Sequence, residues 1–161
     1  MIQNFFEALE GNHLVIAMGQ NGWFYNTCSV LHYFCVFVMT GSIILVDLRV
    51  LGVAGRRTPM LQLANQLSPW MWTAFTVATI TGFLEFLPTG GDFSGSLQFQ
   101  LKTLFILLSV ISAIIILVGV KKWSDLPEAP GGAKVVAVLS ILCFLLAILF
   151  ALNVAAIDGL G

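Results

Sequence analysis

The stretch FYNTCSVLHYFCVFVMTGSIILV, residues 24–46, decides the fold class of this chain. Crossing the roughly 30 Å of bilayer hydrocarbon takes about 20 mostly apolar helical residues, because unpaired backbone groups are too costly to leave in lipid. The stretch is that long, contains no Asp, Glu, Lys or Arg, and is interrupted only by His32. It therefore predicts a helix that spans a membrane.

Three further stretches have the same character, over residues 69–87, 97–120 and 135–156. Ser68 followed by Pro69 predicts the start of the second, because a capping hydroxyl and a proline in the first turn favour a helix N-terminus. The connections are short, so consecutive spans are expected to lie antiparallel. We predict an all-α integral membrane four-helix bundle that forms one domain over residues 1–161.

The composition agrees with insertion into a lipid bilayer. Hydrophobic residues make up 58% of the 161 positions and charged residues only 9%, with a mean hydropathy of +0.97. A soluble domain uses about 25% charged residues on its surface. The formal net charge of −1 lacks the strong basic balance of a nucleic-acid binder. The three cysteines are an odd number in apolar stretches, so a secreted disulfide framework is not expected.

The basic residues predict the orientation of the chain. Six of the seven flank the first and third connections: Arg49, Arg56, Arg57, Lys121, Lys122 and Lys134. Cytoplasmic loops are enriched in Lys and Arg, so these two connections are expected in the cytoplasm and both termini on the periplasmic side of a bacterial inner membrane.

Two short amphipathic pieces are expected outside the spans. Met1 to Glu10 places Ile2, Phe5, Phe6 and Leu9 at helical spacing, which predicts a short N-terminal helix on the outer interface or under a partner subunit. Thr58-Pro59 begins a second piece that continues to Leu67 on the cytoplasmic side.

Three titratable side chains fall inside the predicted spans: His32, Glu85 and Lys102. Such groups are costly in hydrocarbon and are a functional hypothesis by default. Counting about 1.5 Å per residue puts His32 roughly 12 Å deep and the other two nearer the outer surface. Glu85 closes the second span and Lys102 opens the third, so they form a candidate charge pair. The alternative is that both side chains extend to the interface.

His32 lies on a stripe with Cys28, Cys35 and Met39, at helical spacings of four, three and four residues. Thiols, imidazole and thioether suit copper(I) or haem iron, but ligands strung along about 16 Å of helix cannot close around one ion. A haem needs only one axial imidazole, and Met39, His13 or a partner residue is a candidate second ligand. The structural alternative is a histidine hydrogen-bonded across helices to a hydroxyl or carbonyl oxygen.

Arg49, at the cytoplasmic end of the first span, follows Asp47 at a spacing that does not place the two side chains together on a helix. We expect Arg49 to reach a neighbouring helix end, a carboxylate or a lipid phosphate.

Several runs resemble a bacterial four-span membrane family grouped as domain of unknown function 6644. They are Leu31-His32, residues 41–52 with the sequence GSIILVDLRVLG, Ser68-Pro69-Trp70, Thr81-Gly82 and residues 99–104 with the sequence FQLKTL. That family name implies no activity. A looser similarity joins the chain to four-span bacterial protoporphyrinogen oxidase and to the membrane domain of copper-resistance proteins. In the oxidase a histidine of the first span binds haem and a lysine opening a later span is required. The similarity implies these roles for His32 and Lys102.

These observations favour a b-type haem protein of the membrane, with His32 as the iron ligand and with Lys102, Glu85 and Arg49 as charged groups at the cofactor. Electron exchange with a quinone or a periplasmic carrier would follow. The alternative is a cofactor-free accessory subunit of a larger membrane complex or a homo-oligomer. A small transporter is a third class, although few polar groups are available to line a path.

Overall fold

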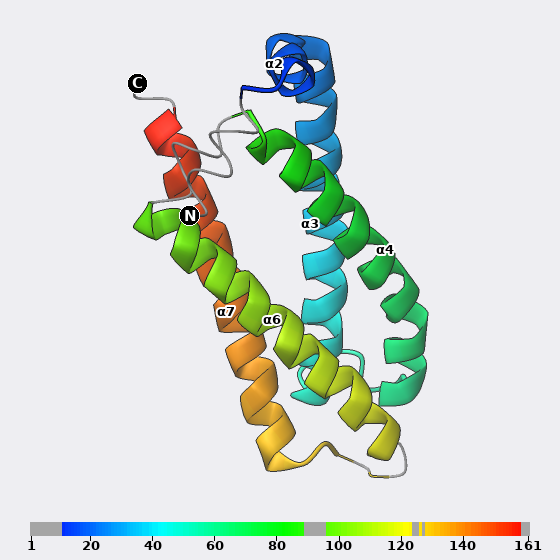
Figure 1. Cartoon of the computed structure of the whole chain (residues 1–161). Coiled ribbons are helices and arrows are strands. Elements are labelled where there is room, and N and C mark those ends of the chain that lie inside the picture. The colour runs from blue at the N-terminus through cyan, green and yellow to red at the C-terminus, as the bar shows by residue number, and fades with distance from the viewer. Residues whose placement is uncertain (1–10, 89–95, 124–125, 127, 159–161) are drawn as a thin grey trace.

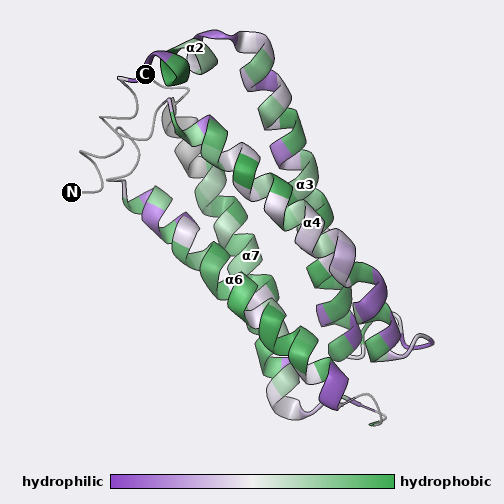
Figure 2. Ribbon diagram, turned by 45° about the vertical axis from the view of Figure 1, so that its right-hand side comes forward, coloured by the Kyte–Doolittle hydropathy of each residue, from purple (hydrophilic) through white to green (hydrophobic). Residues whose placement is uncertain are grey.

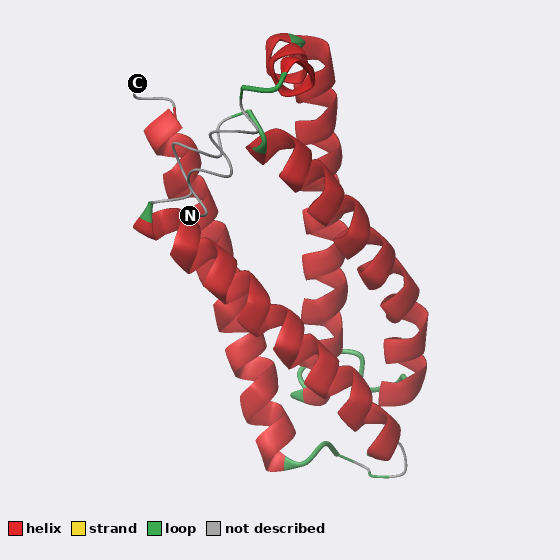
Figure 3. Cartoon of the chain, viewed as in Figure 1, coloured by secondary structure: helices red, strands yellow, loops and turns green. Residues whose placement is uncertain are grey.

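The computed structural model describes residues 11–88, 96–123, 126 and 128–158, and within these ranges the chain is helical without strands (Figures 1 and 3). The elements are α2 (His13–Gln20), α3 (Gly22–Val50), α4 (Met60–Phe86), α6 (Leu97–Lys122) and α7 (Gly131–Asp158). The predicted all-α fold is confirmed for this part of the chain.

Three of the long helices, α3, α6 and α7, are long and apolar enough to cross a membrane. Their apolar side chains are largely exposed, as Phe37 and Leu152 illustrate at 83% and 67% exposure. A chain in water would bury such groups, whereas in a bilayer the acyl chains cover them. The structure therefore supports insertion into a lipid bilayer.

The four long helices pack as two hairpins, α3 with α4 and α6 with α7, and the hairpins meet mainly through α3 and α7. Both connections within the hairpins lie at one end of the molecule, and the hairpins separate toward the end that carries α2 (Figure 1). One core cluster lies near the connections and includes Val50, Met60, Ile116 and Val120. A second, which includes Cys35, Met39, Ala78 and Phe144, lies nearer the middle.

Small side chains allow the helices within each hairpin to approach closely. α4 contributes Ala64, Ala74 and Ala78 to the buried core, and α7 contributes Ala133, Ala137 and Ala147. In membranes, where lipid is as apolar as leucine, such close van der Waals packing is what holds helices together.

α3 is longer than predicted and continues through Val50 instead of ending at Val46. Its end is a Schellman motif, in which Val53 N donates to Leu48 O at 3.0 Å and Gly52 N to Arg49 O at 3.1 Å. Gly52 adopts a φ of 73°, which a residue without a Cβ does at no steric cost. The first charged residue, Asp47, does not end the helix, because it points into the bundle.

The predicted start of the second span at Pro69 is wrong. α4 begins at Met60 and runs through Pro69, so the amphipathic piece expected from Thr58 to Leu67 is the first part of this helix. A proline inside a helix leaves one carbonyl without its usual donor, and α4 nevertheless continues on both sides of Pro69. The predicted N-terminal helix over Met1–Glu10 lies outside the described residues.

Candidate functional site

His32 joins the two helices of the first hairpin. Its Nδ1 atom lies 2.9 Å from the carbonyl oxygen of Ala78 and 3.3 Å from the hydroxyl oxygen of Thr81, both on α4. A carbonyl oxygen can only accept, so Nδ1 carries the proton and donates it to Ala78. In the neutral ring this leaves Nε2 with its lone pair, and Nε2 makes no hydrogen bond to another described residue.

Gly82 makes room for the His32 ring. A Cβ atom built on Gly82 would lie 2.7 Å from Cε1 and 3.0 Å from Nδ1 of His32, closer than side chains approach. Thr81 stands beside it, buried, and donates its hydroxyl proton to Val77 O at 2.8 Å, so that its oxygen is free to accept on its other side. The pair Thr81-Gly82 therefore fixes both the position and the orientation of the imidazole.

A second polar contact lies one turn away along the same interface. Ser29, three residues before His32 on α3, donates its hydroxyl to a carboxylate oxygen of Glu85, four residues after Thr81 on α4. From α6, the Lys102 ammonium is placed within the electrostatic field of the Glu85 carboxylate. No direct ion pair joins these two described side chains. We call Ser29, His32, Thr81, Glu85 and Lys102 the His32 centre.

The sulfur side chains of the predicted stripe do not share a site with His32. Cys35 and Met39 belong to the apolar cluster in the middle of the bundle, with Ala74 and Ala78, and Cys28 is also buried. Met39 is two helical turns, about 10 Å, from His32 along the helix axis. His13 begins the separate helix α2 and is exposed. In the described part of the chain no group of three His, Cys, Asp or Glu residues is arranged for a metal ion.

Arg49 lies far from the His32 centre. It is 17 positions further along α3, which corresponds to about 25 Å. Its Nε donates to Thr58 O at 2.7 Å, and its Cδ carbon covers Gly55, so the side chain fastens the turn that leads into α4. The expectation that Arg49 reaches a neighbouring helix end is met, but the structure does not bring it to His32.

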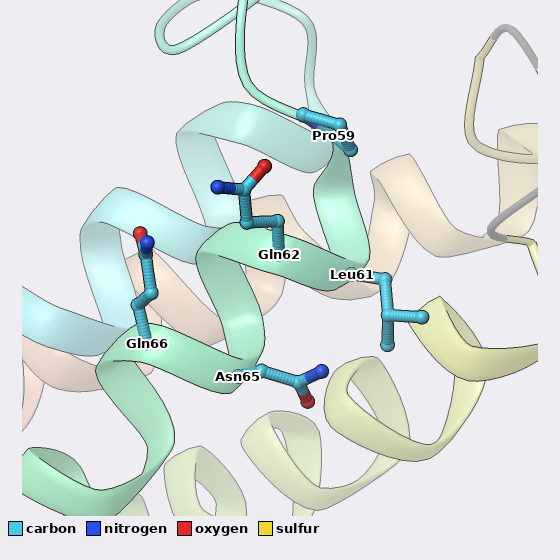
Figure 4. Close-up of a pocket in the computed structure, with 5 residues that line it drawn as sticks. All are labelled: Pro59, Leu61, Gln62, Asn65 and Gln66. Carbon is cyan, nitrogen blue, oxygen red and sulfur yellow. The ribbon is translucent and has the colours of Figure 1, made fainter.

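An open depression lies on the first two turns of α4, lined by Pro59, Leu61, Gln62, Asn65 and Gln66 (Figure 4). Its polar groups are side-chain amides without a titratable partner, so it offers hydrogen bonds but no acid, base or metal ligand. The His32 centre, by contrast, combines an imidazole, a carboxylate and an ammonium group in a half-buried setting.

Comparison of the chain with protein-family models, with curated proteins and with solved structures finds no match. The resemblance drawn from short sequence runs therefore stays a prediction, and the site must be interpreted from its own geometry.

The sequence identified His32, Glu85 and Lys102 but missed Ser29, Thr81 and Gly82 as their partners. The signal that could have found them was their predicted depth in the membrane. Two consecutive antiparallel spans bring residues of similar depth side by side, and Ser29, Thr81 and Gly82 lie near the same outer ends as His32 and Glu85. The Nδ1–H of His32 is held by a carbonyl oxygen, a contact of the kind that orients most metal-binding histidines.

Proposed function

We propose that the chain is a four-span protein of the bacterial inner membrane with both termini on the periplasmic side. α4 is the span that its composition leaves least obvious, because it contains threonines, tryptophans and Glu85. Three of its hydroxyls are nevertheless satisfied within the helix: Thr76, Thr79 and Thr81 donate to the carbonyls of Trp72, Phe75 and Val77 at 2.8–2.9 Å. Hydroxyls that bond to their own helix in this way are suited to lipid.

The distribution of charge supports this orientation. Hydrophilic residues lie at both ends of the molecule, including the end with the two hairpin connections, and the central parts of the helices are mostly apolar (Figure 2). The basic residues among them, Arg56, Arg57, Lys121 and Lys122, are exposed at that end. By the positive-inside rule this end faces the cytoplasm.

Within this frame, His32 is the residue that would hold the iron of a b-type haem in the outer half of the bilayer. The single observation that carries this proposal is the hydrogen bond from Nδ1 to Ala78 O, which directs the basic lone pair to Nε2. When bound, a haem of this type supplies one-electron redox chemistry. The function is then electron exchange with a quinone or a periplasmic carrier.

The rest of the His32 centre would hold and tune the group. Lys102 offers a cation for a propionate, and that charge would offset the cost of burying the carboxylate. Glu85 interacts electrostatically with Lys102 and is held in place by Ser29. Its negative charge therefore sets how strongly Lys102 would attract a propionate. Arg49 has no part in this arrangement, because it lies at the opposite end of α3.

The absorption spectrum of the protein tests the proposal. Protein purified in mild detergent from haem-sufficient cells is expected to show a Soret band, and His32→Ala should abolish it. The matched control is His13→Ala, which removes the other imidazole of the chain and should leave the band intact. Size-exclusion chromatography verifies that each variant remains folded. A colourless wild-type protein that also fails to bind added haemin contradicts the haem assignment.

A cofactor-free accessory subunit is the second candidate, and one observation favours it. Phe99 of α6 stacks on Phe86 of α4, but α6 buries none of its residues before Ser109, and Leu97, Leu104 and Leu107 are exposed. A second copy or a larger membrane complex can cover this face. On this hypothesis His32 is an interhelical hydrogen bond alone, and the wild-type protein is colourless and co-purifies with its complex.

A further inference from the structure

Asp47 is the most deeply buried charged-type residue that the structure describes. It lies on α3 at the seam between the two hairpins, with 1% of its surface exposed. Ser140, opposite it on α7, is fully buried at 0% and is the polar side chain that acts on the Asp47 carboxyl. Neither carboxylate oxygen, nor the Ser140 hydroxyl, has a hydrogen-bond partner of normal geometry.

No described cation faces this carboxyl. On its own helix Arg49 is directed to Thr58 O, and on α7 Lys134 forms an ion pair with Glu128 at 2.8 Å. Burial and Ser140 are the influences that act on the Asp47 carboxyl, and neither is a charge. The other titratable groups on the packed helices are Glu85, bonded to Ser29 on α4, Lys102, Lys121 and Lys122 on α6, Cys143 on α7 and His13 on α2.

An ionised carboxylate in such a place has no compensation. Burying a charge away from water and from any partner costs far more than burying the neutral acid, so the group keeps its proton. A protonated carboxyl also has an O–H donor, and the Ser140 oxygen is a suitable acceptor. One proton therefore accounts for the burial of the acid, and it gives a partner to one Asp47 oxygen and to the Ser140 oxygen.

A metal ion does not fit as well. A hard cation takes about six oxygen ligands, and Asp47 with Ser140 offers three. Thr40, the other buried hydroxyl without a partner, is two helical turns from Asp47, which corresponds to about 10 Å.

We propose that Asp47 and Ser140 form a proton-binding site at the seam between the two hairpins, occupied at neutral pH. The site is independent of the His32 centre, which lies 15 positions away along α3. Loss of the proton would place an uncompensated charge where α3 packs against α7, so the proton is what allows the hairpins to stay closed in this region.

Infrared spectroscopy of protein labelled with ¹³C in the aspartate carboxyl groups tests the proposal on the unaltered chain. At pH 7 the wild-type protein is expected to show one ¹³C-sensitive carbonyl band of a protonated carboxylic acid per chain. The sequence has three other aspartates, Asp92, Asp125 and Asp158, and the Asp47 variant below separates their contribution from that of Asp47. Absence of the acid band overturns the proposal, and this measurement needs no variant that folds.

Two variants assign the band. Asp47→Asn should remove it completely, while the matched control Glu128→Gln, at an exposed carboxylate paired with Lys134, should leave it unchanged. Ser140→Ala keeps the acid and removes its acceptor, so the band should persist at a shifted frequency. A band that survives Asp47→Asn, or that Ser140→Ala does not shift, contradicts the assignment to this pair.

Discussion

Gly82→Ala is the sharpest test of the packing at the His32 centre. The added methyl carbon would stand 2.7 Å from Cε1 and 3.0 Å from Nδ1 of His32, so the ring must move by several tenths of an ångström or more. The 2.9 Å hydrogen bond to Ala78 O depends on the present ring position and should be lost.

The expected cost follows from these two effects. Overpacking a well-packed site costs about 1–3 kcal/mol, and an interhelical hydrogen bond in a membrane contributes about 0.6 kcal/mol. Alanine also favours the helix over glycine by about 1 kcal/mol, which offsets part of the loss. Gly41→Ala on α3 is the matched control, because nothing lies within 4 Å of its added Cβ. Relative to this control, Gly82→Ala should lower the free energy of unfolding by about 1.5–3.5 kcal/mol.

Unfolding in mixed micelles by titration with a denaturing detergent, followed by circular dichroism, measures both variants. A double-mutant cycle then isolates the contact: in a His32→Ala background the ring is absent, so Gly82→Ala should become as mild as Gly41→Ala. Equal stabilities of the Gly82→Ala and Gly41→Ala proteins, or strict additivity with His32→Ala, would refute the close approach of the ring.

Two further predictions concern the end of the molecule with the hairpin connections. The hydrogen bond from Lys134 holds the pKa of Glu128 below its ordinary value, so the contribution of this pair to stability is present above that value and fades as the pH falls through the folded-state pKa. Because Glu128 is exposed, the effect on stability is small. The melting temperatures of the wild type and of Glu128→Gln should converge in acid. A difference between them that grows in acid contradicts the predicted direction of the pH dependence. In a chain without native cysteines, Arg57→Cys should react with an impermeant thiol reagent only after the membrane is opened and Gly11→Cys should react without opening. The reverse pattern inverts the proposed orientation.

The existence of the long helices could be predicted from the sequence, because hydropathy over some twenty residues is a local property of the chain. Their boundaries could not. The first span was predicted to end at Val46, and the second to begin at Pro69 since proline favours a first turn. Asp47 and Pro69 instead lie inside α3 and α4. Asp47 is buried against α7, a contact that hydropathy along one segment does not reveal.

The candidate site divides in the same way. His32, Glu85 and Lys102 are found from sequence because titratable groups in an apolar stretch are conspicuous. Gly82 and Thr81 are not, since a glycine and a threonine are common in membrane helices, and their importance here depends on the His32 ring that lies next to them across the interface. The burial of Asp47 was not predicted for the same reason, because it is created by α7, a helix that begins more than eighty residues later.

Two polar centres at opposite ends of α3 give the two hairpins different roles. The His32 centre is built almost entirely within the first hairpin, and only Lys102 comes from the second. The Asp47–Ser140 site belongs to the seam, so its protonation acts on how the hairpins meet and leaves the contact between α3 and α4 intact.

A change at the seam should therefore reach the His32 centre only through the position of Lys102 relative to Glu85. If the protein carries a haem, Asp47→Asn should consequently shift its spectrum no more than Lys102→Ala does, whereas His32→Ala should abolish the spectrum outright. A larger effect of Asp47→Asn would mean that the hairpins move as one unit.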